Sequence, residues 1–311
     1  MAGLSEGRVL VVNAGSTSLK LSVVAPSGES EPVESLEAPP PGIDAVGHRV
    51  VHGGDRFRDP VSLDNEVVAA LEELVELAPL HNAPALKAIR AARAALPDVL
   101  QVAVFDTAFH ATIPAEASTY AIPARWRDEW GIRRYGFHGL AVQWAAEQVP
   151  LRRLVVCHLG GGCSVTAVLD GRSVDTTMGF SPLEGVPMAT RSGSVDPGAL
   201  IHLLRAHGLS VDQLDDALEH ESGLGALGGL DSALGFGVFT HRVAQAVAAM
   251  AAALGGLDAI AFSGGIGENR EDVRDVVAAR VRFAGDFRVE VVHAREDVVI
   301  ARAVRAALDA V

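Results

Sequence analysis

The chain has 311 residues, of which 49% are hydrophobic and 21% charged, and its formal net charge is −13 at pH 7. This length suits two domains, each large enough for its own core. The acidic balance argues against a nucleic-acid-binding protein, which normally carries a basic face, although a few local arginines can still attract an anionic small molecule.

The first half predicts strands alternating with helices. Strand-like runs at 8–13 and 19–25 flank a small turn and predict a hairpin, whereas the proline-rich stretch 29–42 predicts a loop. Further on, the pattern predicts a strand at 45–52, helices at 65–77 and 82–96, a strand at 101–105 and a helix at 141–148. Asn82 is a candidate N-cap for the second of these helices. Pro150 marks the predicted domain border.

The second half repeats this plan. A hairpin at 153–170 comes first, followed by a Gly-, Ser- and Pro-rich loop at 176–198, helices at 199–207 and 211–219, and a Gly-rich stretch at 223–237. The predicted elements after it are a helix at 239–254, a strand at 257–262, a helix at 271–280, a strand at 288–292 and a last helix at 296–309. Strands alternating with helices indicate an α/β protein.

Cellular location is predicted from three negative features. Residues 1–7 carry no basic region of a secretory signal, and the apolar stretch 243–254 is too short to span a bilayer. The two cysteines, Cys157 and Cys163, lack the spacing of a zinc site and indicate reduced thiols. We therefore expect a cytoplasmic protein without a membrane or nucleic-acid partner.

One short pattern occurs twice, 145 residues apart, starting at Arg8 and at Arg153. In each copy an apolar run leads through one polar residue, Asn13 or His158, into a small Gly/Ser-rich turn and a second strand-like run. Successive backbone N–H groups in such a turn form a concavity that binds anions. Two related domains with such turns could close on a phosphorylated ligand from both sides.

Three Gly-rich segments are candidates for phosphate contact. The turn in Asn13–Lys20 lacks the Walker spacing, so a plain hairpin turn remains an alternative. Gly160-Gly161-Gly162 is the stronger candidate, because three glycines between strands are costly unless the backbone must approach something closely. Gly264–Asn269 lies at a strand-to-helix junction, where the N–H groups at a helix start favour anions.

Four charged or polar side chains are candidates for chemistry. Arg49 and Arg191 lie among apolar or small residues, which favours pairing with an anion: either a substrate or, as an alternative, a structural ion pair. Asp106 follows a strand and is either a Mg²⁺ ligand or a turn cap. His138 either donates to a phosphoryl group or is an ordinary core histidine.

Seven ordered segments make the chain resemble the acetate and propionate kinase family, which belongs to the sugar kinase, actin and heat-shock ATPase fold group. They are Asn13–Lys20, Gly47–Gly54, Ala78–Pro84, Val102–His110, Arg133–Gly139, Asp175–Pro197 and Ser263–Asn269. The resemblance implies two duplicated ribonuclease H-like (actin-like ATPase) domains with a cleft between them. The first would hold residues 1–149 and 296–311, with the acyl substrate and Mg²⁺. The second would hold residues 150–295, with the phosphate donor.

The resemblance also implies the reaction ATP + acetate ⇌ ADP + acetyl phosphate, with Mg²⁺, and a homodimer. The implied catalytic residues are Arg49, His138, Arg191, Asp106 and His81. Those implied for acyl binding are Arg49, Val51, Leu80, Phe137 and Pro182, and those for Mg²⁺ are Asn13, Asp106 and Glu296. The residues implied to bind the nucleotide phosphates are Ser16, Ser18, Lys20, His158, Gly160, Gly161, Gly162, Gly264, Gly265, Ile266, Gly267, Glu268 and Asn269.

Departures from the family pattern cluster on the donor side. The chain is shortened between Leu224 and Phe239, where the family carries a Ser-Asp-x-Arg segment that contacts adenosine, and Gly161 replaces a family Asn. This pattern leaves open a different acyl substrate such as propionate, a donor other than ATP such as pyrophosphate, a phosphohydrolase of the same fold, and a non-catalytic ligand-binding relic.

Overall fold

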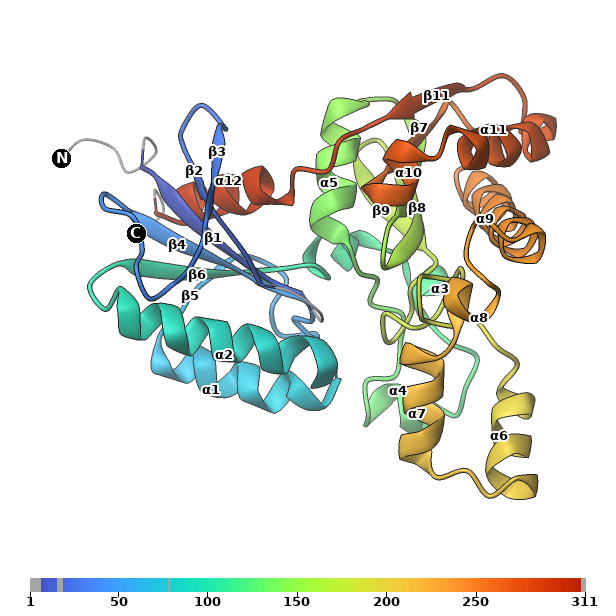
Figure 1. The fold of residues 1–311 in the computed structure, drawn as a ribbon, viewed down its shortest axis with the longest axis horizontal. Helices are drawn as coiled ribbons and strands as arrows, with labels where there is room; N and C mark the ends of the chain where they lie inside the picture. Colours follow the sequence, from blue (N-terminus) through green and yellow to red (C-terminus); the bar gives the residue numbers. More distant parts are fainter. Residues whose placement is uncertain (1–6, 16–18, 78, 309–311) are drawn as a thin grey trace. The chain divides into compact units, whose positions relative to one another are not determined.

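A computed structural model describes residues 7–15, 19–77 and 79–308 of the chain; the side chains of residues 76–81 lie outside this description. The chain divides into two compact units (Figure 1). Unit 1 comprises Met1–Ala111, Phe137–Trp144 and Arg295–Val311, and unit 2 comprises Thr112–Gly136 and Ala145–Ala294.

Unit 1 is built on a six-stranded sheet of order β3-β2-β1-β4-β6-β5. β1 pairs antiparallel with β2 and parallel with β4, and β4 pairs parallel with β6. The carboxyl ends of β1, β4 and β6 therefore meet at one edge. The strands are β1 (Val9–Ala14), β2 (Leu19–Val24), β3 (Ser30–Val33), β4 (Ala45–Val50), β5 (Val61–Ser62) and β6 (Leu100–Phe105).

Helices cover both faces of this sheet (Figure 1). Val9 and Val11 pack against α12 (Glu296–Leu308), whereas Leu10 and Val12 pack against α2 (Pro79–Ala95), so β1 is apolar at successive positions. The α2 side is completed by α1 (Asn65–Glu73) and the 3₁₀ helix η2 (Leu74–Leu77).

Unit 2 is built on a five-stranded sheet of order β11-β10-β7-β8-β9. β7 pairs antiparallel with β8 and parallel with β10, and β10 pairs parallel with β11. The strands are β7 (Arg153–Leu159), β8 (Cys163–Leu169), β9 (Arg172–Thr176), β10 (Ala259–Ser263) and β11 (Arg288–Val291).

The two sheets share one plan, since β9-β8-β7-β10-β11 repeats the order of β3-β2-β1-β4-β6 with the same strand directions. β5 is an additional edge strand of unit 1, antiparallel to β6. The predicted α/β class with two duplicated halves is confirmed. The predicted cleft between the halves stays a prediction.

The remaining helices belong to unit 2, except that η3 (Ala108–Thr112) and α5 (Gly139–Gln148) contribute residues to both units. Within the described residues no helix is long and apolar enough to cross a membrane. The helices that lie wholly in unit 2 are α3 (Ala115–Ser118), α4 (Ala124–Asp128), α6 (Pro197–Ala206), α7 (Val211–His220), α8 (Gly223–Ala226), α9 (Ala233–Ala253), α10 (Gly264–Asn269), α11 (Glu271–Arg280) and η4 (Arg282–Ala284).

Three local expectations differ from the structure. The predicted loop at 29–42 contains β3, which pairs with β2. α2 begins at Pro79, so Asn82 is not its N-cap; the buried Asn82 amide instead bonds the backbone N–H and C=O of His52. α9 begins earlier than expected because Ser232 caps it, accepting a hydrogen bond from Gly235 N–H at 2.9 Å.

The segment 112–136 lies in unit 2, whereas the predicted first domain runs to residue 149. Hydrogen bonds account for this: Thr112 Oγ1 donates to Ser173 O at 2.8 Å, and Tyr120 and Arg134 both bond Glu184. The predicted division into residues 1–149 with 296–311 and residues 150–295 stays a proposal.

Two buried histidines of unit 1 predict a pH-dependent stability. Burial lowers the pKa of His48 and of His110 to about 4. Their stabilising effect is therefore complete above the unfolded pKa of about 6.5 and is lost as the pH falls toward 4, by about 1.4 kcal/mol per pH unit for each histidine. Urea unfolding at pH 7.5 to 4.5 measures this. His48→Gln should flatten the slope and the exposed-site control His202→Gln should not; an unchanged slope in His48→Gln would contradict the assignment.

Candidate active site

Arg49 and Asp106 form a buried ion pair at the carboxyl edge of the unit 1 sheet. Arg49 is in β4, level with Asn13 of β1, and Asp106 directly follows β6. Arg49 Nε donates to Asp106 Oδ2 at 3.1 Å, Nη2 contacts the same oxygen, and Nη1 donates to Asn13 Oδ1 at 3.0 Å. Their side chains are only 13% and 1% exposed. Arg49 thus contacts both Asn13 and Asp106, and all three residues were predicted from the sequence.

The electrostatics of the pair keep Arg49 charged. Burial by itself lowers the pKa of Arg49, but the carboxylates of Asp106 and Glu296 outweigh it and raise that pKa above its usual value. Burial raises the pKa of Asp106, and Arg49 opposes this by favouring its ionised form. A guanidinium held on one side in this way can present its remaining edge to a carboxylate or phosphate.

A divalent cation fits beside this pair. Asp106 Oδ1 is buried and has no hydrogen-bond partner among the described residues. Asn13 Nδ2 donates to Glu296 Oε2 at 3.0 Å, which brings the start of α12 to the same edge. No group of three or more His, Cys, Asp or Glu side chains that could hold a metal occurs within the described parts of the chain. One or two carboxylates with phosphate and water oxygens are the ligand set typical of Mg²⁺.

His138 has a strained backbone next to this cluster. Its φ of 60° lies in the left-handed region, which non-glycine residues rarely adopt. The following Gly139 N–H donates to Asp106 O at 2.9 Å and fixes this turn against β6. The neighbouring Phe137 is buried, and its ring meets His52 edge-on at 5.4 Å between centroids. Such strain persists where a side chain must be presented in one orientation.

The other residues predicted to bind the acyl substrate belong to both units. Val51 is buried in unit 1, as Phe137 is, whereas Pro182 belongs to unit 2. Leu80 and His81 lie in α2, but their side chains are outside the described set, as are Ser16 and Ser18 altogether. Lys20, opposite Asn13 in the β1–β2 pair, is exposed.

The two Gly-rich segments of the second half lie side by side in unit 2. β7 and β10 run parallel, with His158 opposite Ser263, so both strands end at the same edge. A Cβ added to Gly160 would lie 3.7 Å from Gly265 N. Gly160 N–H donates to Gly162 O at 3.0 Å, which closes the turn, and Gly161 is exposed. This geometry suits contact between backbone N–H groups and phosphate.

Glu268 holds the second of these segments in place. Its Oε1 accepts hydrogen bonds from Gly264 N at 3.0 Å and Ala294 N at 3.1 Å, and its Oε2 contacts His293 Nδ1. The carboxylate is therefore engaged within unit 2. Phosphate contact in this segment is better served by the backbone of its glycines than by Glu268.

Gly264 gives a prediction about stability. Its φ is +76°, and an added Cβ would lie 2.7 Å from the backbone oxygen of Leu159. Gly264→Ala should therefore lower the unfolding free energy by about 1–3 kcal/mol. The matched control is Gly265→Ala, because nothing lies within 4 Å of that Cβ position. Equal denaturation midpoints for the two variants would show that the backbone does not need this conformation.

Arg191 forms the structural ion pair that the sequence left open as an alternative, but its partner, Glu219, was not predicted. Its Nε lies 3.1 Å from Glu219 Oε2, and the two side chains are 13% and 10% exposed. Its Nη1 donates to Pro182 O at 3.3 Å. Thr190 Oγ1 donates to Glu219 O at 2.8 Å, so the end of α7 is tied to the Arg191 loop. Glu219 lies in an exposed, acidic, amphipathic helix, and nothing in that pattern marks it as different from its neighbours.

Both cysteines are buried and free. Burial raises the pKa of Cys163 to about 12 and also raises that of Cys157. Thiols that stay protonated are unreactive at neutral pH.

Comparison with known proteins identifies the family. A sequence model of the Acetokinase family matches residues 36–303. An acetate kinase from Synechococcus sp. (strain JA-2-3B'a(2-13)) is 49% identical over 267 residues, covering 78% of this chain and 66% of that protein. One from Gloeobacter violaceus is 42% identical over 323 residues, covering 89% of this chain and 78% of that protein. The chain belongs to the acetokinase family. It spans about two thirds of the length of several of these relatives.

Solved acetokinase-family structures share the fold. A propionate kinase from Francisella tularensis is 31% identical, with a TM-score of 0.87 over 96% of this chain and 98% of that one. The Porphyromonas gingivalis acetate kinase is also 31% identical, with a TM-score of 0.81 over 95% and 98%. These likenesses confirm the predicted fold class.

Proposed function

We propose that the chain is an acetate kinase that transfers the γ-phosphate of ATP reversibly and in line to acetate, with Mg²⁺. The observation that carries the proposal is the Arg49–Asp106–Asn13 cluster: a buried, permanently charged guanidinium beside a buried carboxylate oxygen, Asp106 Oδ1, that has no hydrogen-bond partner in the described parts of the chain. Family membership supports the reaction class. Phosphoryl transfer needs little covalent assistance and much positioning and charge neutralisation, which such a cluster supplies.

Each of the predicted site residues has a distinct role in this proposal. Arg49 binds the carboxylate or the transferring phosphoryl group, and His138 donates to the charge that develops on the phosphoryl oxygens. Arg191, oriented by Glu219 and Pro182, neutralises the same charge. Mg²⁺, held by Asp106 with Asn13 and Glu296, would neutralise phosphate oxygens when bound. The glycine turns at 160–162 and 264–267 hold the donor phosphates.

Acyl specificity follows from the apolar residues. Val51 and Phe137 are buried in unit 1 and neighbour Arg49 and His138 in the sequence, and apolar side chains of this kind would accept the methyl group of acetate. One additional methylene changes binding in an apolar pocket by about 1–3 kcal/mol. Propionate is therefore expected as a slower or weaker substrate than acetate, not an excluded one. The homodimer and the cytoplasmic location stay predictions.

A second candidate is the same transfer from a donor other than ATP, such as pyrophosphate. Its support lies in the shortened stretch before α9. Ser232 Oγ is engaged as the α9 cap, and Asp231, 96% exposed, pairs with Arg270 at 3.3 Å. The Ser232 hydroxyl is therefore not available to adenosine. Pyrophosphate needs no base pocket and could use the glycine turns alone.

Acyl phosphate formation tests both candidates. Acetate, propionate and butyrate are each incubated with ATP, GTP or pyrophosphate and Mg²⁺, and the product is trapped as a hydroxamate. Formation from acetate and ATP supports the first candidate, and formation only from pyrophosphate supports the second. Release of phosphate without an acyl acceptor would indicate a phosphohydrolase instead, and binding without turnover would indicate a relic.

Gly161→Asn gives a prediction about the donor, because it restores the residue expected from the family pattern. Nothing lies within 4 Å of a Cβ at Gly161 and the residue is exposed, so stability should change by less than about 0.5 kcal/mol. The added amide can hydrogen-bond a nucleotide, so the KM for ATP should fall several-fold while the KM for acetate does not change. A KM for ATP that stays the same or rises would contradict this role of the turn.

A further inference from the structure

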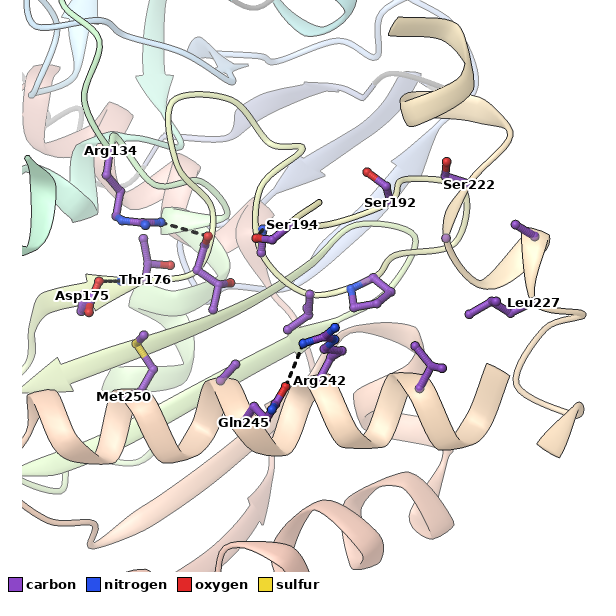
Figure 2. Close-up of a pocket in the computed structure, with 18 residues that line it drawn as sticks. Arg134, Asp175, Thr176, Ser192, Ser194, Ser222, Leu227, Arg242, Gln245 and Met250 are labelled. Atoms are coloured by element: carbon purple, nitrogen blue, oxygen red, sulfur yellow. Dashed lines mark hydrogen bonds between the residues drawn. The ribbon is translucent and has the colours of Figure 1, made fainter. Parts of the chain in front are cut away.

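A cavity of about 610 Å³ lies wholly within unit 2 (Figure 2). This volume is typical of small-molecule sites. Its walls come from the end of β9, the loop at 185–194, the start of α8 and one face of α9. None of the glycines at 160–162 or 264–267 lines it, and neither does Arg191 itself.

One wall of the cavity is apolar. Val238, Ala246 and Met250 of α9 face it, with Val186 and Leu227 from the other segments. In Figure 2 the α9 helix runs along the cavity and presents Met250, Gln245 and Arg242 from one face. An apolar wall of this kind suits an aliphatic or aromatic group.

The charged lining leaves one positive group without a carboxylate partner. Arg134 is paired with Glu184 at 3.0 Å and also donates to Thr177 O at 2.9 Å. Asp175 accepts from Thr176 N–H at 2.7 Å. Arg242 bonds only the neutral Gln245, at 3.1 Å, and no carboxylate among the described residues pairs with it. Arg242 is therefore the natural anchor for an anion entering the cavity.

The opposite wall is the loop that carries Arg191. Gly185, Ser192 and Ser194 line the cavity, and Arg191 lies between them in sequence. Ser194 N–H donates to Gly185 O at 2.9 Å, and Gly185 N–H donates to Ser194 Oγ at 3.1 Å, so the loop is closed at its base. A molecule bound against these residues contacts the loop that carries Arg191.

We propose that this cavity binds a small amphipathic anion, with its apolar body against α9 and its charged group on Arg242, and that occupancy changes the function of Arg191. The binding step stands on the cavity alone. The effect on Arg191 rests on the proposed function.

Binding is tested on the full chain with the fluorescent probe 8-anilinonaphthalene-1-sulfonate, which has two apolar aromatic groups, a naphthalene and a phenyl ring, and one anionic sulfonate. Saturable fluorescence is expected, with affinity at least tenfold weaker in Arg242→Gln and lost in Ala246→Trp, which fills the cavity. The controls are Arg205→Gln and Ala249→Trp, exposed positions outside the cavity that should bind as the unmodified chain does. Unchanged affinity in both cavity variants overturns the site, and so does displacement of the probe by MgADP, because the cavity would then be part of the donor site.

The effect on Arg191 has a separate readout. The probe should change the KM for acetyl phosphate at least threefold in the unmodified chain and not in Ala246→Trp. An unchanged KM in the unmodified chain overturns the regulatory part. If the chain shows no kinase activity, the proposed function fails while the fluorescence result still decides the binding site.

Discussion

Replacing Arg49 with glutamine lowers the rate of acyl phosphate formation by about 10²–10³-fold, the loss typical of one preorganised donor to a transition-state charge. Arg49 is the residue around which the unit 1 cluster is built, because it contacts both Asp106 and Asn13. Glutamine cannot supply a charge or a two-pronged contact to a carboxylate or phosphate. The measurement is kcat for hydroxamate formation at saturating acetate and donor.

The same substitution also affects stability. It leaves Asp106, 1% exposed, without its cation, and breaking a buried ion pair in this way costs about 3–5 kcal/mol. Activity is therefore compared at a temperature where denaturation curves show the variant folded. Arg56→Gln is the matched control, since that arginine is 60% exposed and its ion pair with Glu73 is long, at 4.0 Å. Near-normal kcat in folded Arg49→Gln would remove Arg49 from the chemistry.

Arg191 and Glu219 should separate activity from stability. Arg191→Gln is expected to lower kcat by about 10²–10³-fold for the same reason as Arg49→Gln. Glu219→Gln keeps an acceptor for Arg191 Nε, so kcat should fall less than about tenfold. Its lost negative charge leaves Arg191 more attractive to anions, which should lower the KM for acetyl phosphate.

The double variant completes this comparison. Arg191→Gln alone leaves Glu219, 10% exposed, without its partner, so adding Glu219→Gln should recover stability, with a coupling of about 0.5–3 kcal/mol. Activity should not recover. Glu221→Gln, exposed and two residues further on, is the control. Zero coupling, or a kcat in Glu219→Gln as low as in Arg191→Gln, would contradict a positioning role for Glu219.

The sequence predicted the parts of the site that follow strands. Asn13, Arg49 and Asp106 lie in or just after β1, β4 and β6. These three neighbouring strands are parallel, so their pairing alone brings the three residues to the carboxyl edge of the sheet. The glycines at 160–162 and 264–267 come together for the same reason. Alternating apolar and polar residues, or a continuous apolar run, identify such strands in the sequence. The internal repeat indicates that both halves have the same order of elements.

Contacts between segments distant in sequence were not predictable in this way. Glu219 meets Arg191 only because α7 folds back on a loop of irregular structure, which has no sequence periodicity. Asn82 and Ser232 are both cap-forming residue types, yet only Ser232 caps its helix, because the Asn82 amide instead bonds the backbone of His52. The helix-capping propensity of a residue type therefore cannot show which of these two residues caps its helix.

The central claim is that the chain moves a phosphoryl group between an acyl phosphate and a phosphate donor. Phosphorus NMR of the chain with acetyl phosphate, ADP and Mg²⁺ tests it most directly. The account predicts that the acetyl phosphate resonance declines while the resonances of ATP grow, and that Arg49→Gln slows this exchange by about 10²–10³-fold. Conversion of acetyl phosphate to inorganic phosphate alone, or no change in any resonance with either ADP or phosphate as acceptor, would contradict it.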